Sequence, residues 1–207
     1  MESGFFNPYA PLRIHGRKLP HWQQSGALYF LTWRLADSVP SSMMRDLKFE
    51  RDRWFRSRQL PLKAADELEY RRRFSLRMEE WLDRGMGSCV LRQAELREIV
   101  EDGIVERLEE VEVDSYVVMP NHVHAIVKVD GNRSLPHIVK AAKGRSANRL
   151  NRALGLKGRL WQSGYWDRII RDMSHLYRCR RYIERNPTKA GLGKEEFSLK
   201  LGEKVYE

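Results

Sequence analysis

The sequence has few cysteines and no long apolar stretch, and both shortages limit what the protein can be. Two cysteines, Cys89 and Cys179, occur in 207 residues, so the chain lacks the disulfide framework of small secreted domains. No apolar run approaches the roughly 20 residues of a membrane helix. The N-terminal residues also lack the basic-then-apolar order of a signal peptide. We therefore expect a cytoplasmic protein with no membrane partner.

Acidic residues are also scarce relative to basic ones. The 38 Lys and Arg residues exceed the 28 Asp and Glu residues and give a net charge of +10. Fifteen of the basic residues fall between positions 133 and 189, where three acidic residues oppose them. Basic side chains neutralise phosphates, and aromatic rings such as Trp161 and Trp166 in this stretch stack on unpaired bases. This composition favours a single-stranded nucleic acid as partner over a solvated basic surface, and it favours a nucleoid-associated location.

The candidate DNA contacts are basic residues of this stretch together with one aromatic ring. They are Lys140, Lys143, Arg145, Arg149, Arg152, Arg159, Trp161, Arg168, Arg171, Arg178 and Arg181. A chain of this length favours one domain over residues 1–207.

Apolar spacing and turn residues predict an alternating order of strands and helices. Strands are expected at residues 27–35, 111–118, 122–129 and 165–171, and helices at 92–110, 135–154 and 174–187, with Pro187 ending the last helix. Two charged helices form a helical insertion over residues 41–90. An irregular N-terminal arm (1–25) and a C-terminal tail (193–207) flank these elements. The order predicts an α+β fold with a four-stranded antiparallel sheet and helices on one face.

The sharpest local motif is Met119-Pro120-Asn121-His122-Val123-His124. Residues two apart on a strand point to the same face, so His122 and His124 can reach one ion or one phosphate. The other four histidines show no zinc-ligand spacing relative to this pair. From periodicity alone, a metal pair and a structural pair remain equally open.

A second motif lies on the last helix, where Tyr182 and Asn186 are four residues apart and therefore share a face. Taken singly, Tyr182 reads as a half-buried aromatic residue and Asn186 as a helix end before proline. A tyrosine hydroxyl can, however, attack a phosphodiester, and that step needs a cation near the phosphate. Two imidazoles and an amide oxygen would form a mixed site suited to Mg²⁺ or Mn²⁺.

Together these motifs resemble the single-tyrosine DNA transposases with a His-hydrophobic-His signature. The run Tyr182-Ile-Glu-Arg-Asn-Pro-Thr-Lys-Ala-Gly-Leu192 resembles the tyrosine helix of their REP-associated branch. Further similar blocks lie at residues 29–36, 116–124 and 160–171. The resemblance covers about residues 16–192, and the segment 41–90 is its least diagnostic part.

The resemblance implies a ferredoxin-like sheet with the histidine pair on a central strand. It implies that Tyr182 is the nucleophile and that His122 and His124 bind Mg²⁺ or Mn²⁺. Asn186 stands where the family places a third ligand, although insertion-sequence members often have Gln there. The implied reaction is cleavage and transfer of single-stranded DNA beside hairpins, such as repetitive extragenic palindromes, through a covalent 5′-phosphotyrosine. REP-associated members resemble monomers, which favours a monomer over a dimer that exchanges tyrosine helices.

Three other functions fit parts of the pattern. A non-catalytic module that binds hairpin nucleic acid explains the charge and the rings but leaves the His122/His124 and Tyr182/Asn186 pairs unexplained. A metal-dependent hydrolytic nuclease would use the histidines without the tyrosine. A plasmid-type replication initiator shares the histidine signature and often has two tyrosines, which Tyr177 and Tyr182 fit loosely. The sequence shows no general base for Tyr182.

Overall fold

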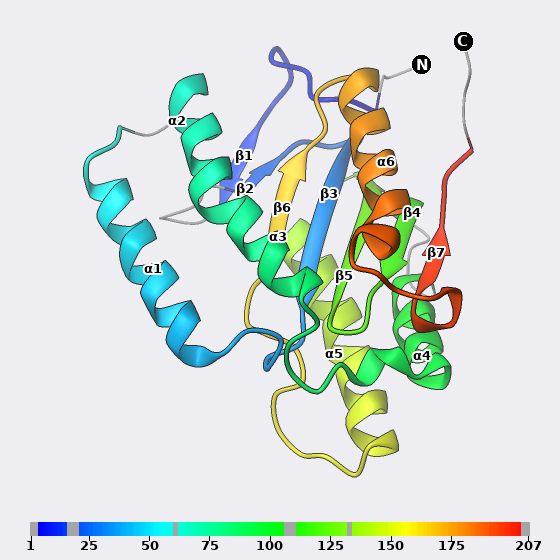
Figure 1. Ribbon diagram of the computed structural model, residues 1–207. Helices are drawn as coiled ribbons and strands as arrows, with labels where there is room; N and C mark the ends of the chain where they lie inside the picture. The colour runs from blue at the N-terminus through cyan, green and yellow to red at the C-terminus, as the bar shows by residue number, and fades with distance from the viewer. Residues whose placement is uncertain (1–3, 16–20, 60–61, 106–110, 132–133, 204–207) are drawn as a thin grey trace.

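The structure is a computed structural model, and it describes residues 4–15, 21–59, 62–105, 111–131 and 134–203 (Figure 1). A five-stranded antiparallel sheet runs through its centre in the order β6–β3–β5–β4–β7. Its strands are β3 (Ala27–Arg34), β4 (Val111–Val118), β5 (His122–Val129), β6 (Trp166–Ile169) and β7 (Ser198–Lys200). With the helices α4 (Ala94–Val105) and α5 (Leu135–Ala153), the first four strands follow one another as a ferredoxin-like βαββαβ unit, which confirms the predicted fold class.

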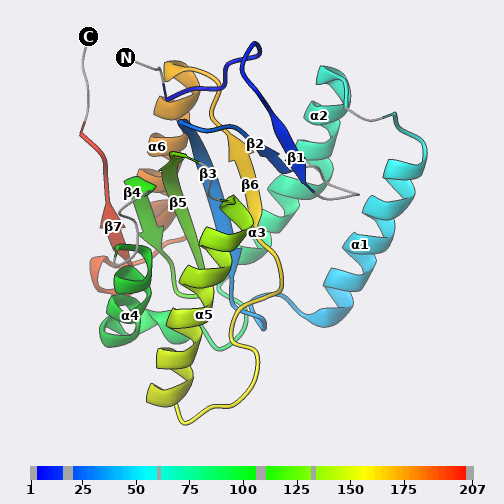
Figure 2. The same cartoon turned by 180° about the vertical axis from the view of Figure 1, so that it is seen from behind.

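Helices cover both faces of this sheet. Helices α4 (Ala94–Val105) and α5 (Leu135–Ala153) pack on one face, and α6 (Met173–Lys189) packs on the other (Figures 1 and 2). The prediction placed helices on one face only. Strand β3 explains the difference, because Tyr29 and Leu31 join the core under α4 and α5 while Leu28 and Phe30 join the core under α6. A strand that is apolar on both sides needs cover on both sides.

The predicted insertion is helical and has a small core of its own. It consists of α1 (Ser41–Arg56), α2 (Ala64–Tyr70), a π-helical turn (Arg71–Ser75) and α3 (Leu76–Asp83). Trp54, Phe74 and Trp81 are buried in this core. The insertion lies beside the β6 edge of the sheet (Figure 1).

Several predicted boundaries differ from the structure. The N-terminal arm contains two short paired strands, β1 (Arg13–His15) and β2 (His21–Gln23), and the tail contains β7, which pairs with β4. Helix α6 continues through Pro187, because a proline in the last turn removes only one intrahelical bond and Ala190 N still donates to Asn186 O at 3.0 Å. Residues 106–110 of the predicted third helix and residues 204–207 of the tail lie outside the described residues.

Gly103 marks the close approach of α4 to α5. A Cβ atom at this position would lie 3.4 Å from the Ala142 carbonyl oxygen and 3.5 Å from the Ser146 Cβ. These are ordinary van der Waals distances, so the two helices would also accommodate an alanine at this position. Among the described helices, none is long and apolar enough to cross a bilayer.

Candidate active site

Strand β5 and helix α6 bring the two predicted motifs together. The rings of His122 and His124 lie 4.7 Å apart, and the Tyr182 ring lies 5.1 Å from His124 at an interplanar angle of 80°. Phe30 packs against both His124 and Tyr182 at 5.4 and 5.7 Å. His122, His124 and Asn186 are almost fully buried. The position of α6 on the His-bearing face of the sheet creates this site.

Asn121 fixes the protonation of the His122 ring. Its Nδ2 donates to the carbonyl oxygens of Leu82 and Met86 at 3.2 Å each, so its Oδ1 faces His122 Nδ1 at 2.7 Å. An amide oxygen only accepts, so Nδ1 must carry the hydrogen. The lone pair of His122 is therefore on Nε2, where a metal ion could take it.

Burial keeps both imidazoles neutral. It lowers the pKa of His122 to about 3. It also lowers the pKa of His124 well below its usual value, and the positive charges of His122 and Lys189 would lower it further. Thr32 Oγ1 lies 2.8 Å from His124 Nδ1 and orients the second ring. Neutral imidazole is the form that binds metals.

Several buried polar atoms at this site lack a partner among the described residues. They are Nε2 of His122, Nε2 of His124, the hydroxyl of Tyr182, and both amide atoms of Asn186. Buried polar atoms are normally hydrogen-bonded, so such a cluster indicates the place of a ligand. Two imidazole nitrogens and an amide oxygen fit a divalent cation that retains open positions. The described residues contain no cluster of three or more His, Cys, Asp or Glu suited to a metal.

The tyrosine hydroxyl lies beside a carboxylate that the sequence did not reveal. Burial is the main cause that raises the pKa of Tyr182, and the carboxylates of Glu79 and Asp83 raise it further, while the Asn186 amide opposes them. Burial also raises the pKa of Glu79 on α3, against the pull of Lys189 and other cations. Sequence reasoning missed Glu79 because it is one acid among many in a charged helix, and only the tertiary fold brings it to Tyr182.

Three of the predicted DNA contacts share one groove. Arg168, Arg171 and Arg178 line a groove of about 540 Å³ together with Arg71 of the insertion and His175. The Arg168 guanidinium stacks 4.8 Å from the centre of the Trp166 ring. This groove lies between the insertion, β6 and α6, next to the candidate active site.

The remaining predicted contacts are dispersed. Lys140, Arg145, Arg149 and Arg152 lie on α5, across the sheet from Tyr182. Arg149 is exposed and forms an ion pair with Asp102 at 2.7 Å. Arg159 is exposed in the loop after α5, and Arg181 is exposed on α6.

Two of the predicted contacts are structural residues. Trp161 is 4% exposed, packs against Trp33 and donates from Nε1 to Ser146 Oγ at 3.0 Å. Its prediction as a DNA-stacking ring is wrong, because a buried ring cannot stack on a base. Lys143 donates from Nζ to the carbonyl oxygens of Gln162 and Gly164 and so holds the loop after Trp161.

The sequence around this site is similar to a known protein family. A family model described as "Transposase IS200 like" matches residues 91–186, a segment that contains His122, His124, Tyr182 and Asn186. Residues 91–186 are therefore similar to the IS200-like transposases. The resemblance seen in the motifs is thereby confirmed at the level of this family.

The chain is also similar to individual proteins. The ISDra2 transposase TnpA of Deinococcus radiodurans is 36% identical over 75 residues, which cover 33% of this chain and 54% of that protein. An uncharacterised protein of Haemophilus influenzae is 28% identical over 99 residues, covering 38% of this chain and 55% of that protein. The chain thus spans about half the length of these relatives. A solved REP-associated tyrosine transposase bound to a REP hairpin aligns with a TM-score of 0.48 and 19% identity, over 86% of this chain and 77% of that one.

Proposed function

We propose that the protein is a metal-dependent single-stranded DNA endonuclease and strand transferase of the REP-associated type. It acts beside hairpins through a covalent 5′-phosphotyrosine at Tyr182 and serves DNA transposition or processing. One observation carries the proposal: within an IS200-like domain, the Tyr182 hydroxyl shares a buried site with two unpartnered imidazole nitrogens.

The reaction is a pair of transesterifications. The Tyr182 oxygen attacks the scissile phosphorus, the bond from phosphorus to the 3′ oxygen breaks, and a 5′-phosphotyrosine and a free 3′-hydroxyl result. Glu79 accepts the phenol proton, since its carboxylate lies beside Tyr182, and the departing 3′ oxygen takes a proton from solvent. A 3′-hydroxyl then attacks the phosphotyrosine and restores both the phosphodiester and the tyrosine, so that rejoining needs no external energy.

His122 Nε2, His124 Nε2 and the Asn186 amide oxygen would hold the Mg²⁺ or Mn²⁺ ion. When bound, this ion would offset the charge that develops on the scissile phosphate. Asn121 and Thr32 orient the two imidazoles for that task. Asn186 is one helical turn from Tyr182, so α6 positions a ligand and the nucleophile together.

The groove of Arg168, Arg171 and Arg178 is the proposed binding site for the DNA backbone. Its guanidinium groups suit phosphate oxygens, and Trp166 offers a ring beside them. A DNA partner in turn supports a nucleoid-associated location in the cytoplasm. Because one chain supplies Tyr182, His122, His124 and Asn186, the proposal includes a monomeric active unit.

The test uses labelled single-stranded hairpins with flanking sequence, incubated with Mg²⁺ or Mn²⁺ and run on a denaturing gel. We expect a metal-dependent, slowly migrating adduct that Tyr182→Phe abolishes while hairpin binding persists. Tyr177→Phe is the matched control, because Tyr177 is an exposed tyrosine of the same helix; loss of the adduct in this variant would instead favour an initiator-like nucleophile.

Two other outcomes would contradict the proposal. Cleavage without an adduct that survives Tyr182→Phe would indicate a hydrolytic nuclease. Tight hairpin binding with neither cleavage nor adduct would indicate a non-catalytic binding module.

A further inference from the structure

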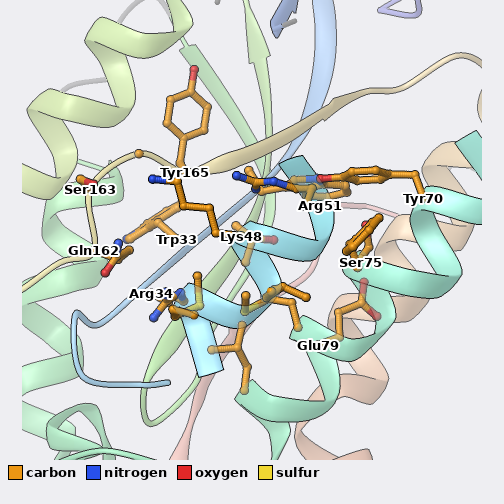
Figure 3. A pocket seen from close by; sticks show the side chains of 18 of the residues that line it. Trp33, Arg34, Lys48, Arg51, Tyr70, Ser75, Glu79, Gln162, Ser163 and Tyr165 are labelled. Atoms are coloured by element: carbon orange, nitrogen blue, oxygen red, sulfur yellow. The ribbon is translucent and has the colours of Figure 1, made fainter. Parts of the chain in front are cut away.

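A second cavity, of about 490 Å³, lies between the insertion and the sheet and reaches His124. Helix α1, the π-helical turn and α3 form one wall, and β3 and the loop at residues 162–164 form the other. Figure 3 shows Arg51, Tyr70 and Glu79 on the insertion side, with Arg34 and Gln162 on the sheet side. Because Glu79 and His124 line it, this cavity is continuous with the candidate active site.

Arg34 gives the cavity an unsatisfied donor. The side chain is 8% exposed, and its Nη1 donates to Ser38 Oγ at 2.9 Å and to the Leu35 carbonyl oxygen at 3.3 Å. Its Nη2 is buried and has no partner within the described part of the chain. A buried cationic donor without an acceptor is costly, so this atom is suited to an acceptor that enters the cavity.

The rest of the lining suits a planar ring with a phosphate attached. Tyr70, Phe74 and Trp166 supply aromatic wall, and Arg45 and Lys48 are exposed cations on α1 at the same cavity. Mostly apolar walls with a few placed polar groups, within this range of volumes, are typical of small-ligand sites. Arginine donors commonly read the acceptor atoms of a base.

We infer that this cavity binds one unpaired nucleotide of the DNA strand, next to the scissile phosphate. Its base lies against the aromatic wall and offers an acceptor to Arg34 Nη2, and its phosphate lies near Arg45 and Lys48. The inference rests on the proposed function and extends it, because it gives the insertion at residues 41–90 a role as the wall of a nucleotide site.

The first test compares a hairpin that carries a single-stranded flank with the same hairpin without a flank, by fluorescence anisotropy. The double variant Arg45→Ala/Lys48→Ala should weaken binding of the flanked hairpin roughly tenfold and leave the other hairpin unaffected. The control, Arg53→Ala/Arg56→Ala, removes the same charge from exposed positions of α1 outside this cavity and should change neither affinity. Equal losses on both DNAs, or the same loss in the control, would overturn the inference.

The second test locates the base. An abasic site moved along the flank should weaken wild-type binding roughly fivefold or more at one position, because a stacked base is lost there. Met44→Trp, which fills the cavity from α1 and lies outside the arginine groove, should remove this position dependence while the melting temperature stays within a few degrees. A wild-type protein that tolerates an abasic site at every flank position would refute a nucleotide cavity.

These results are separable from a failure of the proposed chemistry. Tyr182→Phe should retain the flank preference, because it removes the hydroxyl that forms the adduct and leaves the cavity lining intact. Flank-dependent binding without any adduct in the wild type would support the cavity and refute the transesterification. An adduct in the wild type without any flank dependence of binding would support the transesterification and refute the nucleotide cavity.

Discussion

Asn121 shows how a side chain outside the proposed metal site can orient a residue within it. Its amide nitrogen donates to two backbone carbonyls, so its oxygen has a single orientation toward His122. That orientation leaves the lone pair on His122 Nε2. Such outer partners of metal-binding histidines commonly control affinity as well as geometry.

Asn121→Ala should lower the affinity for Mn²⁺ about 10- to 100-fold, because the His122 ring loses its fixed tautomer and orientation. Isothermal titration calorimetry with the DNA-free protein measures this. Asn151→Ala is the matched control, since Asn151 bonds the Gly158 carbonyl far from the site. Unchanged Mn²⁺ affinity in a folded Asn121→Ala protein would contradict the role of Asn121.

His175 should make the folded protein sensitive to acid. Burial, followed by the positive charges of Arg168 and Arg178, lowers the pKa of His175 from 6.5 to about 4, and Asp172 opposes this. Between these values the unfolded chain binds a proton that the folded protein excludes, so stability falls as the pH drops from about 6.5 to 4. For a half-exposed ring, we expect a loss of about 1 kcal/mol after solvent screening.

Melting temperatures of the wild type and of His175→Gln at pH 7 and pH 4.5 test this. The wild type should lose about 2–4 °C more than the variant on acidification. Parallel loss of stability in both proteins would show that other groups govern the acid response.

At the scale of elements, α3 and α6 meet at the proposed nucleophile. Glu79 comes from α3 and Tyr182 from α6, so under the proposed function the insertion supplies the base. Glu79→Gln should slow adduct formation about 10²- to 10⁴-fold, with little change in DNA affinity, because the amide cannot take the phenol proton. Quenched-flow gels under single-turnover conditions measure this rate.

Glu80→Gln is the control for that experiment. Glu80 is adjacent to Glu79, but its side chain is 62% exposed and pairs with Arg84 at 2.6 Å. It should leave the rate unchanged. A wild-type rate in Glu79→Gln would show that Glu79 is not the proton acceptor.

The elements that the sequence predicts well carry a local pattern. Strands β4 and β5 match their predicted bounds, because β-branched residues dominate both and Pro120-Asn121 forms the turn. Strands β1, β2 and β7 have three residues each. The first two pair with each other, and β7 pairs with the distant β4. No local pattern marks so short a strand.

The same contrast holds for the candidate site. Spacings of two on a strand and four on a helix pointed to His122, His124, Tyr182 and Asn186, and the structure brings all four together. Glu79 and Arg34 carry no such signal, because only tertiary packing buries them at the site. The prediction for Trp161 was wrong because it relied on composition alone. Trp161 lies among basic residues in the sequence, whereas packing buries it in the core.

At the scale of the whole molecule, one chain brings the rings of His124 and Tyr182 to 5.1 Å from each other. This distance supports the proposed monomeric unit. An equimolar mixture of Tyr182→Phe and His124→Ala should therefore form no more adduct than either variant alone, and light scattering should show a monomer. Restored adduct formation in the mixture would indicate dimers that exchange α6.

The burial of Tyr182 bears on how readily the protein would cleave DNA that it meets by chance. A free tyrosine is already protonated at neutral pH, and burial makes the Tyr182 phenol still harder to ionise. Under the proposed function, the reaction therefore depends on a correctly bound strand and ion. A protein of this kind would cut little DNA that it meets by chance.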